Sequence, residues 1–182
     1  MKHDETIERG LAVQGIFMIA VLVTIILFST KTFGQLTTST LPIIKINTMG
    51  NTIVDEPKVQ TMIEVIDNAS GTNNITDPAT WTGYCGMEFR GNSTQDPDKK
   101  TYSVEIWTAA GADTSITLLG LPKEEDWIFH ASHFDKTWSR NVLFFNAWQR
   151  MSHYASRYKF FELVIDGDYR GLYILMEKIK RD

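Results

Sequence analysis

The sequence predicts an α+β fold in which a mostly antiparallel sheet packs on one main buried helix. Short stretches with alternating apolar and polar residues come first in the chain, and one long segment with a helical apolar pattern follows them. A last pair of strand-like stretches then flanks a tight turn. This order, strands first, then a helix, then a hairpin, is typical of α+β proteins with antiparallel sheets.

Four strands are predicted between residues 41 and 107, because each stretch is apolar, β-branched or alternating. They cover residues 41–47, 58–67, 83–90 and 101–107. Turn residues follow the first strand at 49–51. The intervening segments 68–81 and 91–100 are rich in Asn, Gly, Pro and charged residues, so we expect exposed loops there.

The helix is predicted over residues 136–151, with Asp135 as its N-cap. Its apolar residues recur at helical spacing and are numerous enough to bury much of its circumference. They are Trp138, Val142, Phe144, Phe145, Ala147, Trp148 and Met151. Residues 160–165 and 171–176 are predicted to form a hairpin in which Gly167 takes the positive φ of the turn.

Composition limits the function classes. The 182 residues carry 18 basic and 22 acidic side chains, a net charge of −4, so nothing in the overall charge predicts nucleic-acid binding. Cys85 is the single cysteine, which excludes an intrachain disulfide and predicts a small buried residue in a strand. His130 and His133 have no further His or Cys to complete a metal site, so none is expected in this chain.

Residues 1–34 are predicted to direct export. Residues 11–28 carry no charge and lie between Arg9 and Lys31. Their length fits either a signal peptide cleaved before Gln35 or an uncleaved membrane anchor. Both interpretations export the rest of the chain, as a secreted or a cell-surface protein. Residues 35–40 are then a linker, and 41–182 form the domain.

Several short motifs occur in a fixed order along residues 41–182. They are Glu88-Phe-Arg-Gly-Asn-Ser-Thr94, Lys99-Lys-Thr-Tyr102, Leu118-Leu-Gly-Leu-Pro122 with Asp126-Trp127, Asp135-Lys136 with Arg140-Asn141, and Gly171-Leu-Tyr173 with Met176-Glu-Lys-Ile-Lys-Arg-Asp182. In this order the sequence resembles the CotH (spore coat protein H) kinase family. The resemblance implies the N-terminal lobe of an atypical protein kinase, a transferase outside the cytosol.

The resemblance also implies ATP and Mg²⁺ as cofactors and transfer of the γ-phosphate to Ser or Thr of a protein substrate. The metal-binding and catalytic aspartates of the family lie downstream of the last motif, in a C-terminal lobe that this chain lacks. We therefore expect the chain to be truncated and inactive on its own. A lobe that docks on a second one is also expected to expose an apolar face and to self-associate.

Phosphoryl transfer requires cations and backbone N–H groups around the phosphates. The predicted nucleotide-binding residues are Arg90, Gly91, Ser93, Lys99, Lys100, Arg140 and Glu177. Lys99 and Lys100 are expected to point to opposite faces, and alternation with Tyr102 favours Lys100 as the inward one. Asp98 beside Lys99 weakens the local positive field.

Each of these residues also has a structural interpretation, because Arg90 can pair with a neighbouring acid and Glu177 can be a solvated carboxylate. The alternative function is accordingly a non-catalytic exported module, either a pseudokinase or a structural coat or surface component. In either case the membrane is expected to be contacted only through residues 1–34.

Overall fold

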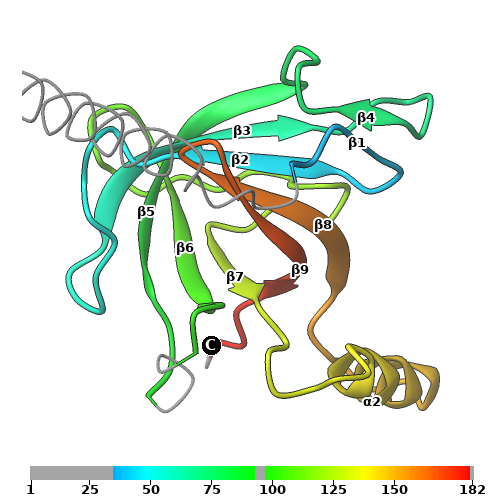
Figure 1. Cartoon of the computed structure of the whole chain (residues 1–182). Coiled ribbons are helices and arrows are strands. Elements are labelled where there is room, and N and C mark those ends of the chain that lie inside the picture. The colour runs from blue at the N-terminus through cyan, green and yellow to red at the C-terminus, as the bar shows by residue number, and fades with distance from the viewer. Residues whose placement is uncertain (1–34, 93–96, 181–182) are drawn as a thin grey trace, which may run out of the picture. The chain divides into compact units, whose positions relative to one another are not determined.

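Seven strands pair edge to edge in a closed ring in the order β2-β3-β5-β6-β7-β9-β8 (Figure 1). The structure is a computed structural model that describes residues 35–92 and 97–180. Two short strands, β1 and β4, form a separate ribbon. The elements are β1 (Thr38–Ser39), β2 (Ile43–Asn47), β3 (Val59–Ile66), β4 (Asn73–Asn74), β5 (Trp81–Phe89), β6 (Tyr102–Trp107), β7 (Asp126–His130), α2 (Arg140–Arg150), β8 (Tyr158–Ile165) and β9 (Asp168–Glu177).

The pairing of β2 with β8 closes the barrel. Ile43 lies opposite Ile66 of β3 in an antiparallel pair and opposite Glu162 of β8 in a parallel pair. The other neighbouring strands of the ring are antiparallel. A closed sheet leaves no row of unpaired backbone groups at an edge, so the barrel needs no cover against edge-to-edge association.

The barrel interior is filled by its own strands. Alternate residues of each strand point inward, as the period of two requires. The buried interior side chains include Ile44, Ile46, Ile63, Val65, Cys85, Met87, Val104, Ile106, Trp127, Phe129, Phe161, Leu163, Tyr173 and Leu175. Phe129 and Phe161 meet edge to face, with ring centroids 4.8 Å apart. Such packing is typical of a solid core.

The predicted strands and hairpin are confirmed to within a few residues. Gly167 has φ +80° in the β8–β9 turn, and Cys85 is fully buried on β5. Burial raises the pKa of the Cys85 thiol to about 12, so it is inert at neutral pH. Strand β7 was not predicted, since a five-residue apolar run is too short to show alternation.

The predicted fold class is wrong. The strands form a closed barrel, and the main helix is not buried, in contrast to the expected sheet on a buried helix like a kinase N-terminal lobe. The barrel fills its own interior, so α2 is needed only as a cover on the outside. Val142 and Phe145 of α2 pack on Ile128, Ile174 and Met176 of the outer wall.

The helix is also shorter than predicted. It begins at Arg140 after the N-cap Ser139, whose side chain makes no capping bond. Asp135 nevertheless stabilises this end, because its carboxylate accepts the N–H of Arg140 at 2.9 Å. In the part of the chain that the structure describes, no helix is long and apolar enough to cross a bilayer.

Gly86 on β5 makes room for an aromatic ring on the outer wall. A Cβ at this position would collide with the indole of Trp107, which comes from the neighbouring strand β6. We expect Gly86→Ala to lower the free energy of unfolding by about 1–3 kcal/mol, because the indole must move. Urea denaturation measures this change.

Two further variants make the test of Gly86 specific. Thr82→Ala, at an exposed site on the same strand, should change stability by less than about 0.5 kcal/mol. In a Trp107→Ala background the Gly86→Ala change should cost much less, because the collision is gone. An equal cost in both backgrounds would show that the indole is not the reason for the glycine.

Candidate functional site

A pocket of about 220 Å³ lies where the segment before β6 meets the end of β7 and the start of α2. Three separate segments of the chain contribute to its wall. The lining residues are Lys99, Thr101, His130, Ser132, His133, Phe134, Asp135, Arg140 and Asn141. Several of these side chains are cationic or titratable, which distinguishes the pocket from the apolar barrel interior.

Lys99 is held in this pocket by three contacts. Its ammonium donates a hydrogen bond to the carbonyl oxygen of Leu172, at 2.8 Å. The same nitrogen lies 4.2 Å from the ring centroid of Trp138 and 4.8 Å from that of Tyr173. Among the described residues, cation–π contacts and one backbone acceptor therefore hold the charge, and no carboxylate is in direct contact with it.

Gly171 on β9 is part of the seat for this lysine. Its φ is +89°, a conformation that favours glycine, and a Cβ here would lie 3.2 Å from Nζ of Lys99. The hydroxyl of Tyr173 also donates to the carbonyl oxygen of Lys100 at 2.9 Å. The Gly171-Leu-Tyr173 motif thus fixes the segment that carries the lysine pair.

Burial lowers the pKa of Lys99 to about 8, although the negative charge of Glu162 acts in the opposite direction. Glu162 itself accepts hydrogen bonds from Tyr169 at 2.7 Å and Ser39 at 3.2 Å. A half-buried ammonium that lacks a contacting carboxylate is poorly compensated. It therefore favours an anion as an added partner.

The start of α2 adds a second cation. Nε of Arg140 lies 3.5 Å from Oδ1 of Asp135, and the side chain of Arg140 is 72% exposed. Asp135 also accepts hydrogen bonds from Thr137, and these bonds together with Arg140 keep its pKa below the usual range. Because Arg140 is largely solvent-exposed, its guanidinium remains accessible to a ligand in the pocket.

His130 lies on the pocket wall beside Asn141, with 3.2 Å between its Nε2 and the side-chain amide nitrogen. Burial lowers the pKa of His130, Asp135 raises it and Arg90 lowers it further. The field of Arg90 therefore reaches the pocket, although Arg90 is not one of its lining residues. The backbone N–H of Arg90 bonds to the carbonyl of Thr101, which places both segments side by side.

The structure thus brings together three of the predicted residues, Lys99, Arg140 and, at the margin, Arg90. Gly91 follows Arg90 with φ +100°. Ser93 lies outside the described residues. His130 was not predicted as a pocket residue, and the role of Gly171 was not predicted either. The only sign of its positive φ in the sequence is that the residue is a glycine.

Lys99 lies in the pocket, whereas the alternation argument favoured Lys100. The expected alternation was extended from the predicted strand 101–107 back to the two lysines, but β6 begins only at Tyr102. The backbone before it is irregular, so the period of two does not extend to residue 99. Lys100 lies over the ring of Phe89, 5.8 Å from its centroid.

Glu177 lies elsewhere and has a structural role. It is buried at the end of β9 and forms an ion pair with Arg157, with 3.0 Å between Nε and Oε1. Its second oxygen accepts the backbone N–H of Arg157 at 2.9 Å, and its backbone carbonyl accepts the hydroxyl of Ser156. This ion pair connects the segment after α2 to β9, and both oxygens of the Glu177 carboxylate are occupied by contacts with Arg157.

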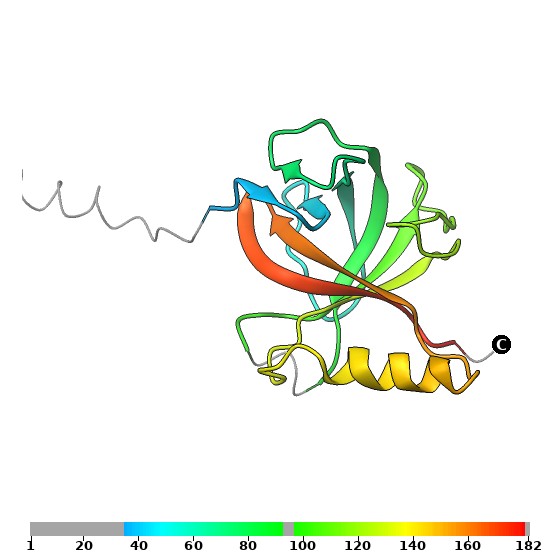
Figure 2. The same ribbon diagram turned by 90° about the vertical axis from the view of Figure 1, so that its right-hand side faces the viewer.

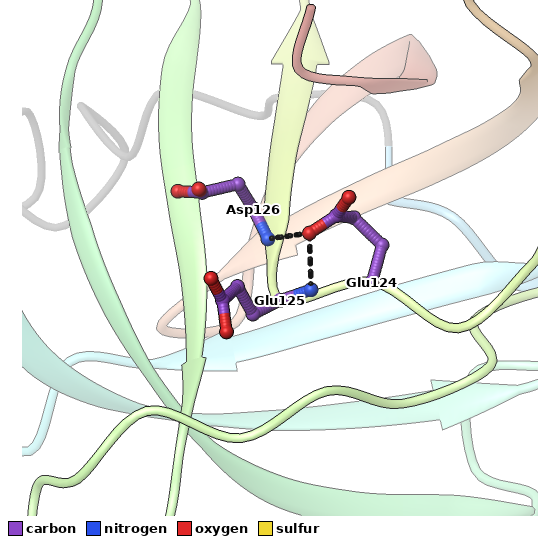
Figure 3. Close-up of side chains that lie close together, drawn as sticks. All are labelled: Glu124, Glu125 and Asp126. Carbon is purple, nitrogen blue, oxygen red and sulfur yellow. Dashed lines mark hydrogen bonds between the residues drawn. The ribbon is translucent and has the colours of Figure 1, made fainter. Parts of the chain in front are cut away.

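Three neighbouring carboxylates at the start of β7, from Glu124, Glu125 and Asp126, lie close enough together to suggest a cation site (Figure 3). One oxygen of Glu124 accepts the backbone N–H groups of Glu125 and Asp126, at 2.7 and 3.2 Å. The ammonium of Lys180 lies within 3.2 Å of an oxygen from each of the three acids. A lysine therefore already neutralises this cluster.

The Lys178–Asp126 pair, with 3.2 Å between Nζ and Oδ1, adds to the same network. Burial alone would raise the pKa of Asp126, but Lys180 and Lys178 lower it overall. The basic residues of the last motif thus have a structural task, since they fix the end of β9 against the start of β7.

Fold and site together define a closed β-barrel domain with a cationic pocket on its outer side. The family model described as CotH kinase protein matches residues 87–182, and the chain belongs to this family. The matched segment contains every residue that lines the pocket, whereas β2, β3 and most of β5 precede it. No curated protein matches the chain.

The lowered pKa of Lys99 predicts a pH-dependent stability. Between the folded pKa of about 8 and the unfolded value near ~10.4, the unfolded chain binds more protons than the folded chain. The stability of the wild-type protein should therefore rise with pH through this window, relative to Lys99→Met. Urea denaturation at pH 7.0 to 10.5 (approximate limits set by the two pKa values) tests this.

Lys123→Met serves as the control, because Lys123 is exposed. Its stability difference from the wild type should stay flat over the same pH range. A flat difference for Lys99→Met as well would mean that its ammonium is ordinarily solvated.

The contribution of Asp126 to stability should also depend on pH. Because the folded state lowers its pKa, Asp126 stabilises the protein above its unfolded pKa, and the effect is lost as pH falls through the folded value. Asp126→Asn should cost about 1–2 kcal/mol at pH 7, and the difference should shrink toward zero in acid. Chemical denaturation at several pH values measures both, with exposed Asp98→Asn as a control expected to be neutral throughout.

Proposed function

We propose that the pocket around Lys99 binds the phosphates of ATP, and that the chain is the nucleotide-binding part of an exported CotH-like kinase acting on protein Ser or Thr. The observation that carries the proposal is the half-buried ammonium of Lys99, which has a lowered pKa and no ion pair with any carboxylate of residues 35–92 and 97–180. It lies within the segment that the family model matches.

The surrounding charges support an anionic ligand. Lys99 and Arg140 line the pocket, Arg90 lies near enough to affect His130, and Asp135 is the one carboxylate among the described residues of the wall. Arg140 can bind phosphate oxygens through two N–H groups, and Lys99 supplies a point charge. In this proposal, binding a phosphate compensates the lysine charge that the protein alone leaves poorly solvated.

In this proposal the chain's residues bind and orient the phosphates, and Mg²⁺ and its carboxylate ligands belong to a C-terminal part that follows the last motif. Bound Mg²⁺ neutralises developing charge on the transferred phosphoryl group. The clustered acids Glu124, Glu125 and Asp126 form ion pairs with Lys178 or Lys180, which supports the proposal that other residues bind the metal.

Export is proposed from residues 11–28, which lie outside the described residues. Their uncharged run fits a signal peptide or an anchor.

The alternative function, a non-catalytic surface or coat module, has its own support. Both cations that line the pocket already have an internal contact: Lys99 has the carbonyl of Leu172, and Arg140 has Asp135. Such contacts suffice to stabilise a fold without a nucleotide. Nucleotide binding therefore discriminates between the two functions.

The test is ATP binding measured by calorimetry on the wild type and on variants of the pocket. Lys99→Ala and Arg140→Ala should each weaken binding about 10- to 100-fold, the usual cost of one hydrogen bond to a charged group. Arg150→Ala, at the opposite end of α2, is the matched control and should bind ATP like the wild type. AMP should bind more weakly than ATP, because the pocket contacts phosphates.

Equal affinity of the wild type and Lys99→Ala would remove this lysine from the site. Absence of ATP binding by a folded wild-type chain would favour the non-catalytic module.

A further inference from the structure

Most of the exposed large apolar side chains gather on one surface. Among the described residues eight such side chains are exposed, and six lie between residues 134 and 154. They are Phe134, Leu143, Phe144, Trp148, Met151 and Tyr154, with 49–76% exposure. We call residues 133–159 the α2 surface.

Helix α2 carries two apolar stripes on opposite sides. At about 100° per residue, Val142 and Phe145 lie on the side that packs on the barrel wall. Phe144, Trp148 and Met151 follow one another at i, i+4 and i+7 on the other side, which faces away from the barrel. The outward stripe has no packing role in the fold, so its apolar character requires a different explanation.

The α2 surface is also basic in an acidic protein. Residues 133–159 contain five basic side chains and one acid, Asp135, a net charge of +4, and one of the five, Arg157, is paired with Glu177 of β9. The rest of the chain has 13 basic and 21 acidic residues, a net charge of −8. Lys136, Arg150 and Lys159 form no ion pair with any residue that the structure describes.

We propose that the α2 surface docks on an anionic lipid bilayer. A helix that lies flat with Phe, Leu, Trp and Met outward and with Lys and Arg at its margins is typical of interfacial membrane binding. Each basic residue near an anionic bilayer adds to the attraction. A second copy is a poorer occupant, because two surfaces of the same net charge repel each other.

The orientation of the fold agrees with such docking. Helix α2 lies along one side of the barrel, and the loop around β4 lies on the opposite side in both views (Figures 1 and 2). No described element covers the outward side of α2 (Figure 2). The inference goes beyond the proposed phosphate site and does not depend on it, since the outward stripe of Phe144, Trp148 and Met151 does not line the pocket.

The experiment places an environment-sensitive fluorophore on a single cysteine of the full chain. Cys85 is the one native cysteine and is fully buried, so Phe144→Cys can be labelled selectively. Vesicles of phosphatidylcholine alone and of phosphatidylcholine with phosphatidylglycerol are compared. We expect the label at 144 to shift to shorter wavelength with the anionic vesicles only.

A control label reports on the opposite side of the barrel. Thr72→Cys, an exposed position in the loop before β4, should show no shift with either vesicle. Comparison of the two labels distinguishes docking through α2 from attachment of the chain through residues 1–34. Attachment through residues 1–34 would be independent of lipid charge.

Charge variants complete the test. Arg150→Gln should weaken the docked state about fivefold, the effect of one basic residue at an anionic surface, and Lys123→Gln away from the surface should not. An unshifted label at 144 with anionic vesicles would overturn the proposal, as would an equal shift with neutral vesicles. A shift without vesicles that grows with protein concentration would instead show that a second copy covers the surface.

Discussion

The parallel pairing of β2 with β8 is the constraint on which the rest of the structure depends. It joins the first long strand of the domain to one that follows more than a hundred residues later, and so closes the sheet. Within the ring β9 pairs with β7 on one side and β8 on the other, and it presents Gly171 and Leu172 to Lys99. The pocket is therefore not a property of one local motif, since its lysine is held by a strand from the other end of the domain.

The motifs that identify the family divide into two physical tasks. Lys99, Arg140 and Gly171 shape the pocket, whereas Glu177 and Lys180 form ion pairs that fix the end of β9. Both tasks produce charged residues in short sequence motifs, so the letters alone do not separate them. Burial and contact partners separate the two tasks. Glu177 is buried and forms an ion pair with Arg157, whereas the ammonium of Lys99 contacts aromatic rings and one backbone carbonyl.

Much of the strand pattern could be predicted from the sequence, because a wall with one face on a packed core alternates with a period of two. The closed ring could not, since the β2–β8 pairing is long-range and leaves no local signal. The position of α2 was mispredicted because its apolar residues occupy two stripes, and sequence does not show which one packs. The direction of Lys99 could not be inferred for a local reason: the irregular backbone before Tyr102 breaks the alternation of the strand, and Lys99 lies in the pocket.

The two cationic regions of the protein are continuous, and this links the site to the surface. Arg140 begins α2 and lines the pocket, while Phe134 belongs both to the pocket wall and to the exposed apolar set. Because the rest of the chain has a net charge of −8, the attraction for anions is concentrated on this one side. A phosphate in the pocket and an anionic surface against α2 would share the field of the same few cations. Occupancy of one would therefore weaken the electrostatic attraction at the other, because each anion screens the charge that draws the second.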